Sequence, residues 1–133
     1  MEIKPIILDT SAYSNLQRSN PKLHDYVSKN HVKVFSCFVW AELLYGFKGG
    51  NKEKKNLKIL KDFLNFSEIP MVHTTDSTIH NYVSIKNNLR KNGTPISLVD
   101  IWIAAHAIEH GCQLITLDKH FLKIKNLDSW FPN

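Results

Sequence analysis

Residues 6–8 are three consecutive aliphatic residues, Ile-Ile-Leu, and a carboxylate, Asp9, follows them directly. Such a run is typical of a strand buried on both faces, as in the parallel sheets of α/β proteins. Asp9 would then stand at the carboxyl end of that strand, where open α/β sheets bind their ligands. The alternative is that Asp9 and Ser11 only cap the next helix, because both residue types favour that position.

The rest of the chain alternates between segments typical of strands and of helices. Strands are expected at 3–8, 32–36, 69–72 and 113–117, with a short edge strand at 124–127. Helices are expected at 11–18, 21–30, 38–47, 52–66, 76–91 and 98–110. This alternation predicts a right-handed, mostly parallel α/β sandwich. A chain of 133 residues suits one domain, spanning residues 1–133.

Acidic residues recur at equivalent places in this pattern. Asp9 and Asp118 follow the first and fourth strands, and Glu42 lies in the early turns of the helix after the second strand. Asp100 lies in the first turn of the helix that leads to the fourth strand. We expect these acids at one edge of the sheet, because each helix leaves from the carboxyl edge of the preceding strand. Asp76 is a further candidate, but its sequence context indicates only a helix start.

Each of the four acids sits in or beside an apolar segment. Two like charges about 4 Å apart, at an effective dielectric of about 20, repel by about 4 kcal/mol. The cluster must therefore share protons or hold a cation. Carboxylate oxygens suit Mg²⁺ or Mn²⁺, and such a site can activate water for an in-line attack on a phosphodiester. Taken singly, each acid also fits a cap, a turn or a helix surface.

The expected helix at 52–66 has an apolar face and a lysine-rich face. Its inward face is formed by Leu57, Leu60, Phe63 and Leu64. Most of the remaining surface is occupied by Lys52, Lys54, Lys55, Lys58 and Lys61. This surface is either a solvated lysine face or a contact for a nucleic acid backbone. The formal net charge of +5 favours an anionic partner. In the helix at 76–91, the inward residues are expected to be Ile79, Tyr82, Val83 and Leu89.

The cysteines and the lengths of the apolar segments indicate the cellular compartment of the protein. Cys37 and Cys112 are the only two cysteines, and both have apolar neighbours. We expect buried free thiols in a reducing cytoplasm. No apolar run approaches the roughly 20 residues that span a bilayer, and the N-terminus lacks the layout of a secretory signal. The sequence therefore predicts a cytoplasmic protein without a membrane partner.

Other catalytic patterns fit less well. His106 and His110 have a spacing that can hold zinc, but Ala107 stands where the zincin motif has Glu. An aspartyl-phosphate phosphatase would have a second Asp at the position of Ser11. The chain has neither a Gly-rich phosphate loop nor a Ser-centred nucleophile elbow.

Four segments together resemble the successive motifs of PIN domains, and most closely the small single-domain toxins of the VapC type. They are Leu8-Asp9-Thr10-Ser11, Ala41-Glu42-Leu43-Leu44-Tyr45-Gly46, Asp100-Ile101-Trp102-Ile103-Ala104-Ala105 and Leu114-Ile115-Thr116-Leu117-Asp118-Lys119-His120-Phe121. The resemblance covers nearly the whole chain, with the motifs in the right order and spacing. It implies a PIN-like three-layer α/β/α sandwich and an endoribonuclease that depends on Mg²⁺ or Mn²⁺.

The resemblance also implies roles for residues and partners. The residues that would bind the metal are Asp9, Glu42, Asp100 and Asp118. Ser11, or Thr10, would orient a carboxylate or a water molecule. The partners would be an RNA substrate, a second copy of the chain, and a cognate antitoxin that wraps the toxin and blocks its acidic site. Trp102 stands where the family usually has a smaller aliphatic residue, and we expect it to affect packing more than chemistry.

Two other functions stay open at this point. One is a catalytically silent RNA- or protein-binding module that keeps the fold. Carboxylates in apolar surroundings argue against it, because burying them without a cation is costly. The other is an RNA-processing nuclease that is not a toxin. Related 5′-nuclease-like enzymes usually have longer chains with extra acids and insertions.

Overall fold

The computed structural model describes residues 4–18, 20–29 and 32–132. Its strands are β1 (Ile6–Leu8), β2 (Lys33–Ser36), β3 (Met71–Val72), β4 (Gln113–Ile115) and β5 (Ser129–Trp130). They form one five-stranded sheet in the order β3-β2-β1-β4-β5, and all four pairings are parallel. The central strand is β1, whose three residues are all buried. The expected parallel α/β architecture is confirmed.

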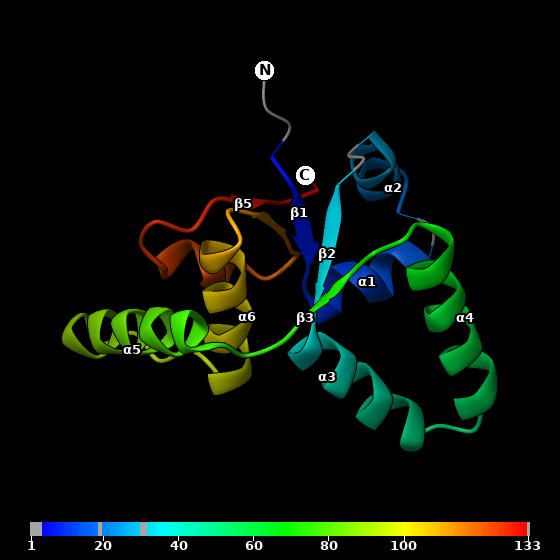
Figure 1. Cartoon of the computed structure of the whole chain (residues 1–133), viewed down its shortest axis with the longest axis horizontal. Helices are drawn as coiled ribbons and strands as arrows, with labels where there is room; N and C mark the ends of the chain where they lie inside the picture. The colour runs from blue at the N-terminus through cyan, green and yellow to red at the C-terminus, as the bar shows by residue number, and fades with distance from the viewer. Residues whose placement is uncertain (1–3, 19, 30–31, 133) are drawn as a thin grey trace.

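The helices of the described residues are α1 (Thr10–Gln17), α2 (Pro21–Lys29), α3 (Cys37–Lys48), α4 (Glu53–Phe66), α5 (Asp76–Lys91) and α6 (Leu98–Glu109), with a short 3₁₀ helix, η1 (Lys119–Lys123). In Figure 1, α5 and α6 lie to the left of the strands, and α3 and α4 lie below and to the right of them. No helix in the described part of the chain is long and apolar enough to span a membrane.

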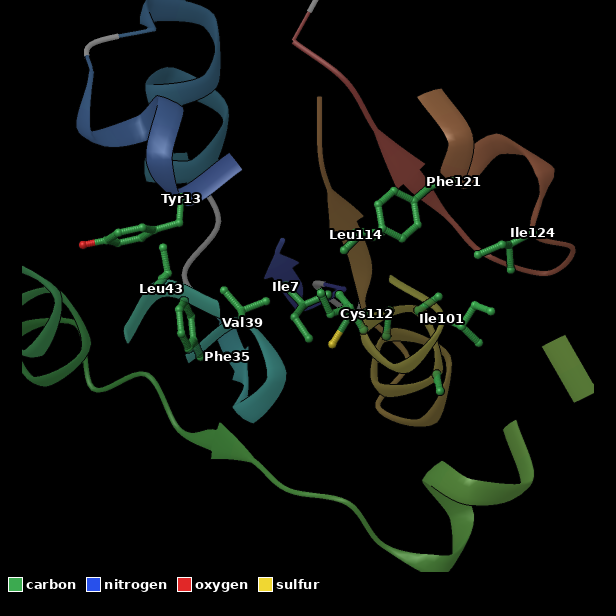
Figure 2. Close-up of a cluster of buried hydrophobic side chains, with 14 of the residues drawn as sticks. Ile7, Tyr13, Phe35, Val39, Leu43, Ile101, Cys112, Leu114, Phe121 and Ile124 are labelled. Carbon is green, nitrogen blue, oxygen red and sulfur yellow. The ribbon is translucent and has the colours of Figure 1, made fainter. Parts of the chain in front are cut away.

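Two apolar clusters cover the two faces of the sheet, because successive strand residues point to opposite faces. Ile7 belongs to the larger cluster, to which α3, α4, α5 and α6 contribute. Figure 2 shows Ile7 and Leu114 at the centre of this cluster, with Ile101 and Phe121 nearby. Ile6 and Leu8 face the smaller cluster, which α1 and α2 complete. The molecule is therefore the three-layer α/β/α sandwich that the resemblance implies.

Side-chain caps fix where several helices begin. The Asp9 carboxylate caps α1, the Ser36 hydroxyl caps α3 and the Ser97 hydroxyl caps α6. Each of these oxygens accepts a hydrogen bond from a backbone N–H that has no partner within its helix. Helix α1 follows β1 and helix α3 follows β2, while α6 leads back to β4. Three helix N-termini therefore lie at the carboxyl edge of the sheet.

The C-terminal segment differs from the sequence-based expectation. No strand forms at 124–127; the last strand is instead β5. Phe121 and Ile124 are buried in the larger core cluster, beside η1. Asn126 has a positive φ of 64°, a conformation incompatible with a strand. Burial of these two side chains thus requires a 3₁₀ turn and a sharp bend before the chain can pair with β4.

Smaller differences concern boundaries and burial. Residue 3, the expected start of the first strand, and residue 30, the expected end of the second helix, lie outside the described residues. Ile79 and Val83, expected to face inward, are 44% and 56% exposed. Cys112 is buried as expected, but Cys37 is only half-buried, and both are free thiols.

Candidate active site at the carboxyl edge of the sheet

The four acids come from four different segments that end or begin at this edge. Asp9 follows β1, Glu42 lies in α3, Asp100 lies in the first turn of α6, and Asp118 caps η1 after β4. Burial raises the pKa of both Asp9 and Asp100; the charge of Asp100 adds to the rise at Asp9, and the charges of Glu42 and Asp118 add to the rise at Asp100. Repulsion between like charges falls as their separation grows. Asp100 is the one of the four acids whose charge interacts with each of the other three.

Asp9 is the most deeply placed of the four, with only 4% of its surface exposed. Its Oδ1 accepts hydrogen bonds from the Ser11 hydroxyl and the Ala12 N–H, each at 2.8 Å, and its Oδ2 accepts one from the Thr116 hydroxyl at 2.5 Å. Burial raises the pKa of Asp9, and these three hydrogen bonds oppose that rise. The carboxylate is thus held in one orientation by three donors.

Two hydroxyl groups also fix the loop after β4. The Leu117 N–H donates to the Ser11 hydroxyl oxygen at 3.2 Å, and the Asp118 N–H donates to the Thr116 hydroxyl oxygen at 3.0 Å. Both hydroxyls therefore join Asp9 to the backbone that carries Asp118. Sequence reasoning missed Thr116, although a buried polar residue directly after an apolar strand was a signal for it.

A hydroxyl group of helix α1 orients the Glu42 carboxylate. The Thr10 hydroxyl, at the start of α1, donates a hydrogen bond to Glu42 Oε1. Glu42 is half-buried on α3. Thr10 and Ser11, adjacent in the sequence, therefore orient two different carboxylates, Glu42 and Asp9.

Asp100 and Asp118 lie nearer to solvent, and a histidine accompanies them. Burial, followed by Glu42 and Asp118, raises the pKa of Asp100, while Ser97 and His120 lower it. His120 Nδ1 lies 2.8 Å from Asp118 Oδ1, and the His120 N–H donates to the same oxygen at 2.9 Å. Sequence reasoning gave His120 no role of its own, because no spacing rule connects it with the acids.

The four acids supply the oxygen ligands that a divalent cation prefers. Among the described residues, no three carboxylate, imidazole or thiol side chains converge closely enough to hold an ion as they stand. Asp9, Glu42 and Asp118 instead contact hydroxyl or imidazole groups. Mg²⁺ commonly binds one or two carboxylates and completes its shell with water and substrate phosphate. One or two of these four carboxylates, with water and substrate phosphate, would suit that chemistry.

Other candidates from the sequence lie away from this cluster. The Asp76 side chain is 89% exposed and pairs with His80 at 3.2 Å, as expected of an acid at a helix start. His106 is fully buried, with Nδ1 2.8 Å from the Ser36 hydroxyl, and forms no metal-binding group with other described residues. On the lysine-rich face of α4, Lys58 pairs with Asp62 at 2.7 Å.

Known proteins resemble this chain over most of its length. The model of the PIN domain family matches residues 6–127. Ribonuclease VapC1 of Rickettsia felis is 32% identical over 126 residues, which cover 92% of each chain. Ribonuclease VapC1 of Haemophilus influenzae strain R2866 is 29% identical over 126 residues, covering 91% of this chain and 92% of that protein.

Solved structures show the same similarity. VapBC-1 from nontypeable Haemophilus influenzae has a chain that is 26% identical, with a TM-score of 0.84 over 96% of this chain and 97% of that one. VapBC2 from Rickettsia felis, bound to a DNA fragment from its promoter, has a chain that is 24% identical. Its TM-score is 0.88 over 97% of this chain and 99% of that one, a likeness of fold.

Proposed function

The chain belongs to the PIN domain family, and from that premise we propose that it is an endoribonuclease toxin of a toxin–antitoxin pair, using Mg²⁺ or Mn²⁺ held by the acids of the sheet edge. The observation that supports this proposal is the buried Asp9 carboxylate, held by three donors at the carboxyl edge of the sheet, where the elements that carry Glu42, Asp100 and Asp118 also begin. Curated relatives that match nearly end to end are named ribonucleases. Residues 1–133 would form one such domain.

The residues proposed to hold the ion are Asp9, Glu42, Asp100 and Asp118. A bound divalent ion would activate water and stabilise charge on the phosphodiester. Asp9 is prepared for this task, because three donors fix its orientation. Each carboxylate oxygen has about two acceptor positions, so Asp9 Oδ2, which accepts the Thr116 hydroxyl, has a second position for a further ligand. Ser11 acts as a positioning residue for Asp9.

The remaining residues hold the outer carboxylates in place. Thr10 fixes Glu42 through its hydroxyl, and Ser97 and His120 favour the ionised form of Asp100. Ionisation of Asp9 and Asp100 is opposed by burial and by repulsion, so a cation at this edge relieves both penalties. The net charge of +5 favours approach of an anionic RNA despite the acidic site.

The proposal extends to partners and compartment. Several structural neighbours are VapBC structures, and one is a toxin–antitoxin complex from Klebsiella pneumoniae. We propose that this chain likewise binds a cognate antitoxin, that it pairs with a second copy of itself, and that it acts on RNA in the cytoplasm.

An RNA cleavage assay tests the enzymatic part. The purified protein, incubated with a mixed RNA pool, should cut it with Mg²⁺ or Mn²⁺ and stop when EDTA is added. Asp100→Asn should reduce the rate at least a hundredfold while circular dichroism stays unchanged. Asp62→Asn is the matched control, because Asp62 is an exposed acid on α4 that pairs with Lys58. Cleavage by Asp100→Asn at the rate of the control would show that the site is assigned wrongly.

The toxin role requires a separate test. Expression of the wild-type chain should arrest growth, and the product of the adjacent reading frame should relieve the arrest. Normal growth with active enzyme present would instead favour an RNA-processing nuclease.

A further inference from the structure

Helix α3 carries one acid of the candidate site and continues beyond it. In Figure 1, α3 starts at the end of β2 and extends away from the strands, so its later turns lie outside the sheet edge. Glu42 lies in the middle of α3, and its carboxylate accepts the Thr10 hydroxyl. Tyr45 and Gly46 follow three and four positions later, a spacing that places both beside Glu42 on the helix surface. Both residues are exposed, so this part of α3 is open to solvent next to the acids.

Tyr45 presents an aromatic ring to solvent, with 82% of its surface exposed. Within the described part of the chain, its ring stacks on no other ring and its hydroxyl has no hydrogen-bond partner. The exposed positions one turn before and after it are Ala41, Lys48 and Gly49, none of which has a large apolar side chain. A lone ring lacks the contiguous apolar area that the core of a protein interface needs, but it suffices for one nucleic acid base.

Gly46 is the second unusual residue of this stretch. Glycine destabilises the interior of a helix relative to alanine. Packing in the free protein does not require it: apart from the chain neighbours and the adjoining helix backbone, no atom lies within 4 Å of the place where a methyl group would stand. The φ of Gly46 is negative, unlike those of Gly93 and Gly111, so the backbone conformation does not require glycine either. Glycine instead leaves the helix backbone bare, which allows the close approach of a ligand.

We propose that Tyr45 and Gly46 form a binding position for one nucleotide of single-stranded RNA next to the carboxylates. The base stacks on the Tyr45 ring, as unpaired RNA bases stack on aromatic side chains. The sugar–phosphate backbone crosses α3 at Gly46, where no side chain obstructs it, and passes Glu42 one turn earlier. This inference rests on the proposed ribonuclease function, because it states how the substrate of that site is held.

The charges beyond Tyr45 agree with an RNA path in this direction. Lys48, one turn further along α3, has a side chain that is 75% exposed and lies 3.3 Å from Glu53. An exposed ion pair of this kind is weak, so Lys48 is available to a phosphate group. Three more exposed lysines follow around the start of α4: Lys52, Lys54 and Lys55. Positive charge therefore continues from Tyr45 away from the acids, as binding of a phosphate backbone requires.

RNA binding without cleavage tests the stacked base. The probe is a uridine decamer with 2-aminopurine at every third position, titrated with Ca²⁺ in place of Mg²⁺ and checked by gel electrophoresis to remain intact. The wild type should quench the fluorescence of the probe, because 2-aminopurine loses fluorescence when it stacks. Tyr45→Leu should abolish this quenching and raise the Kd about 5- to 150-fold, the effect of losing one stacked base. Tyr45→Phe should recover most of the affinity and the quenching, because the ring remains.

Substitutions of Gly46 separate a substrate contact from a structural role. Gly46→Ala should raise the Tm by about 1–5 °C, because alanine favours a helix and the space around position 46 is open. The same variant should raise the Kd of the decamer about threefold, and Gly46→Leu about tenfold, since a side chain there keeps the RNA backbone away from the helix. A glycine needed only for packing would show the opposite change in Tm.

Phe66→Leu is the matched control, because Phe66 is a 93% exposed aromatic residue at the far end of α4 from Lys52. It should bind the decamer as the wild type does. Circular dichroism should show that every variant is folded, since the changed side chains are exposed.

The proposal fails if the wild type does not bind or quench the decamer, or if Tyr45→Leu and Gly46→Leu bind it like the control. It also fails if Tyr45→Leu changes only the molar mass in solution or the binding of the protein encoded by the adjacent reading frame, since Tyr45 would then be a protein contact. Cleavage of the mixed RNA pool with Mg²⁺ is measured separately. Quenched binding by a wild type that cuts no RNA would refute the nuclease while supporting this nucleotide position.

Discussion

Replacement of Trp102 by leucine provides a direct test of how the helices around the acidic edge are held. The Trp102 ring stacks on Tyr82 of α5, with ring centres 3.9 Å apart and planes 14° apart. It also stacks on Phe38 of α3, with ring centres 5.3 Å apart and planes again 14° apart. Trp102 lies in α6, two residues after Asp100, so this stack joins the three helices next to the site.

The expected loss of stability follows from these two contacts. Aromatic pairs of this geometry contribute about 0.5–1.5 kcal/mol each beyond the burial of apolar area, which gives about 1–3 kcal/mol for two. The smaller leucine side chain also gives up about 1 kcal/mol of burial. Trp102→Leu should therefore lower the free energy of unfolding by about 2–4 kcal/mol. Trp102→Phe should recover part of this loss, because an aromatic ring remains to stack on Tyr82 and Phe38.

Urea denaturation followed by far-UV circular dichroism measures the change. Trp130→Leu serves as the matched control, because Trp130 stacks on Tyr26 at 3.9 Å in a separate pair outside this three-ring stack. At a temperature where all variants are folded, Trp102→Leu should still cut RNA, since no carboxylate is removed. A loss below about 0.5 kcal/mol would refute the reasoning that the stack stabilises the fold.

Three other perturbations have defined outcomes. Thr116→Val removes a donor to the buried Asp9 carboxylate, so it should cost about 1.5–3 kcal/mol in denaturant unfolding at pH 7.5, and Thr116→Ser should not. Burial lowers the pKa of His106, so the neutral imidazole contributes stability above about pH 6.5, and this contribution is lost as the pH falls. The Tm of His106→Asn should therefore fall less below that pH than the Tm of the wild type. Mn²⁺ at about 100 times its dissociation constant should stabilise the wild type by about 2.7 kcal/mol in thermal unfolding but leave Asp100→Asn unchanged.

The positions of the acids could be predicted because local rules determine them. Asp9 follows an apolar strand, and Asp100 and Asp118 occupy cap or first-turn positions that parallel α/β geometry places at one edge. Burial raises the pKa of Asp100, and the charges of Glu42 and Asp118 add to that rise, while their joint binding of a metal stays a prediction. The number of helices and their approximate bounds also follow from periodicity, which the structure reproduces from α1 to α6.

The contacts among these side chains could not be predicted, because they depend on long-range geometry. Thr116 reaches Asp9 from 107 positions away, through the pairing of β1 with β4. Periodicity places Ile79 and Val83 on one side of a helix, but it does not show whether another element covers that side. In the described part of the chain both side chains stay exposed. The strand expected at 124–127 failed because burial of Phe121 and Ile124 in the core outweighs local strand propensity.

The central claim is that the carboxylates of the sheet edge hold the divalent ion used for RNA cleavage. Calorimetric titration of Mn²⁺ into the wild type, and into the double variant Asp9→Asn plus Asp100→Asn, tests it most directly. The account predicts saturable binding by the wild type, and none by a double variant whose circular dichroism is unchanged. Equal binding by both proteins, or no binding by the wild type even with an uncleavable RNA present, would contradict it.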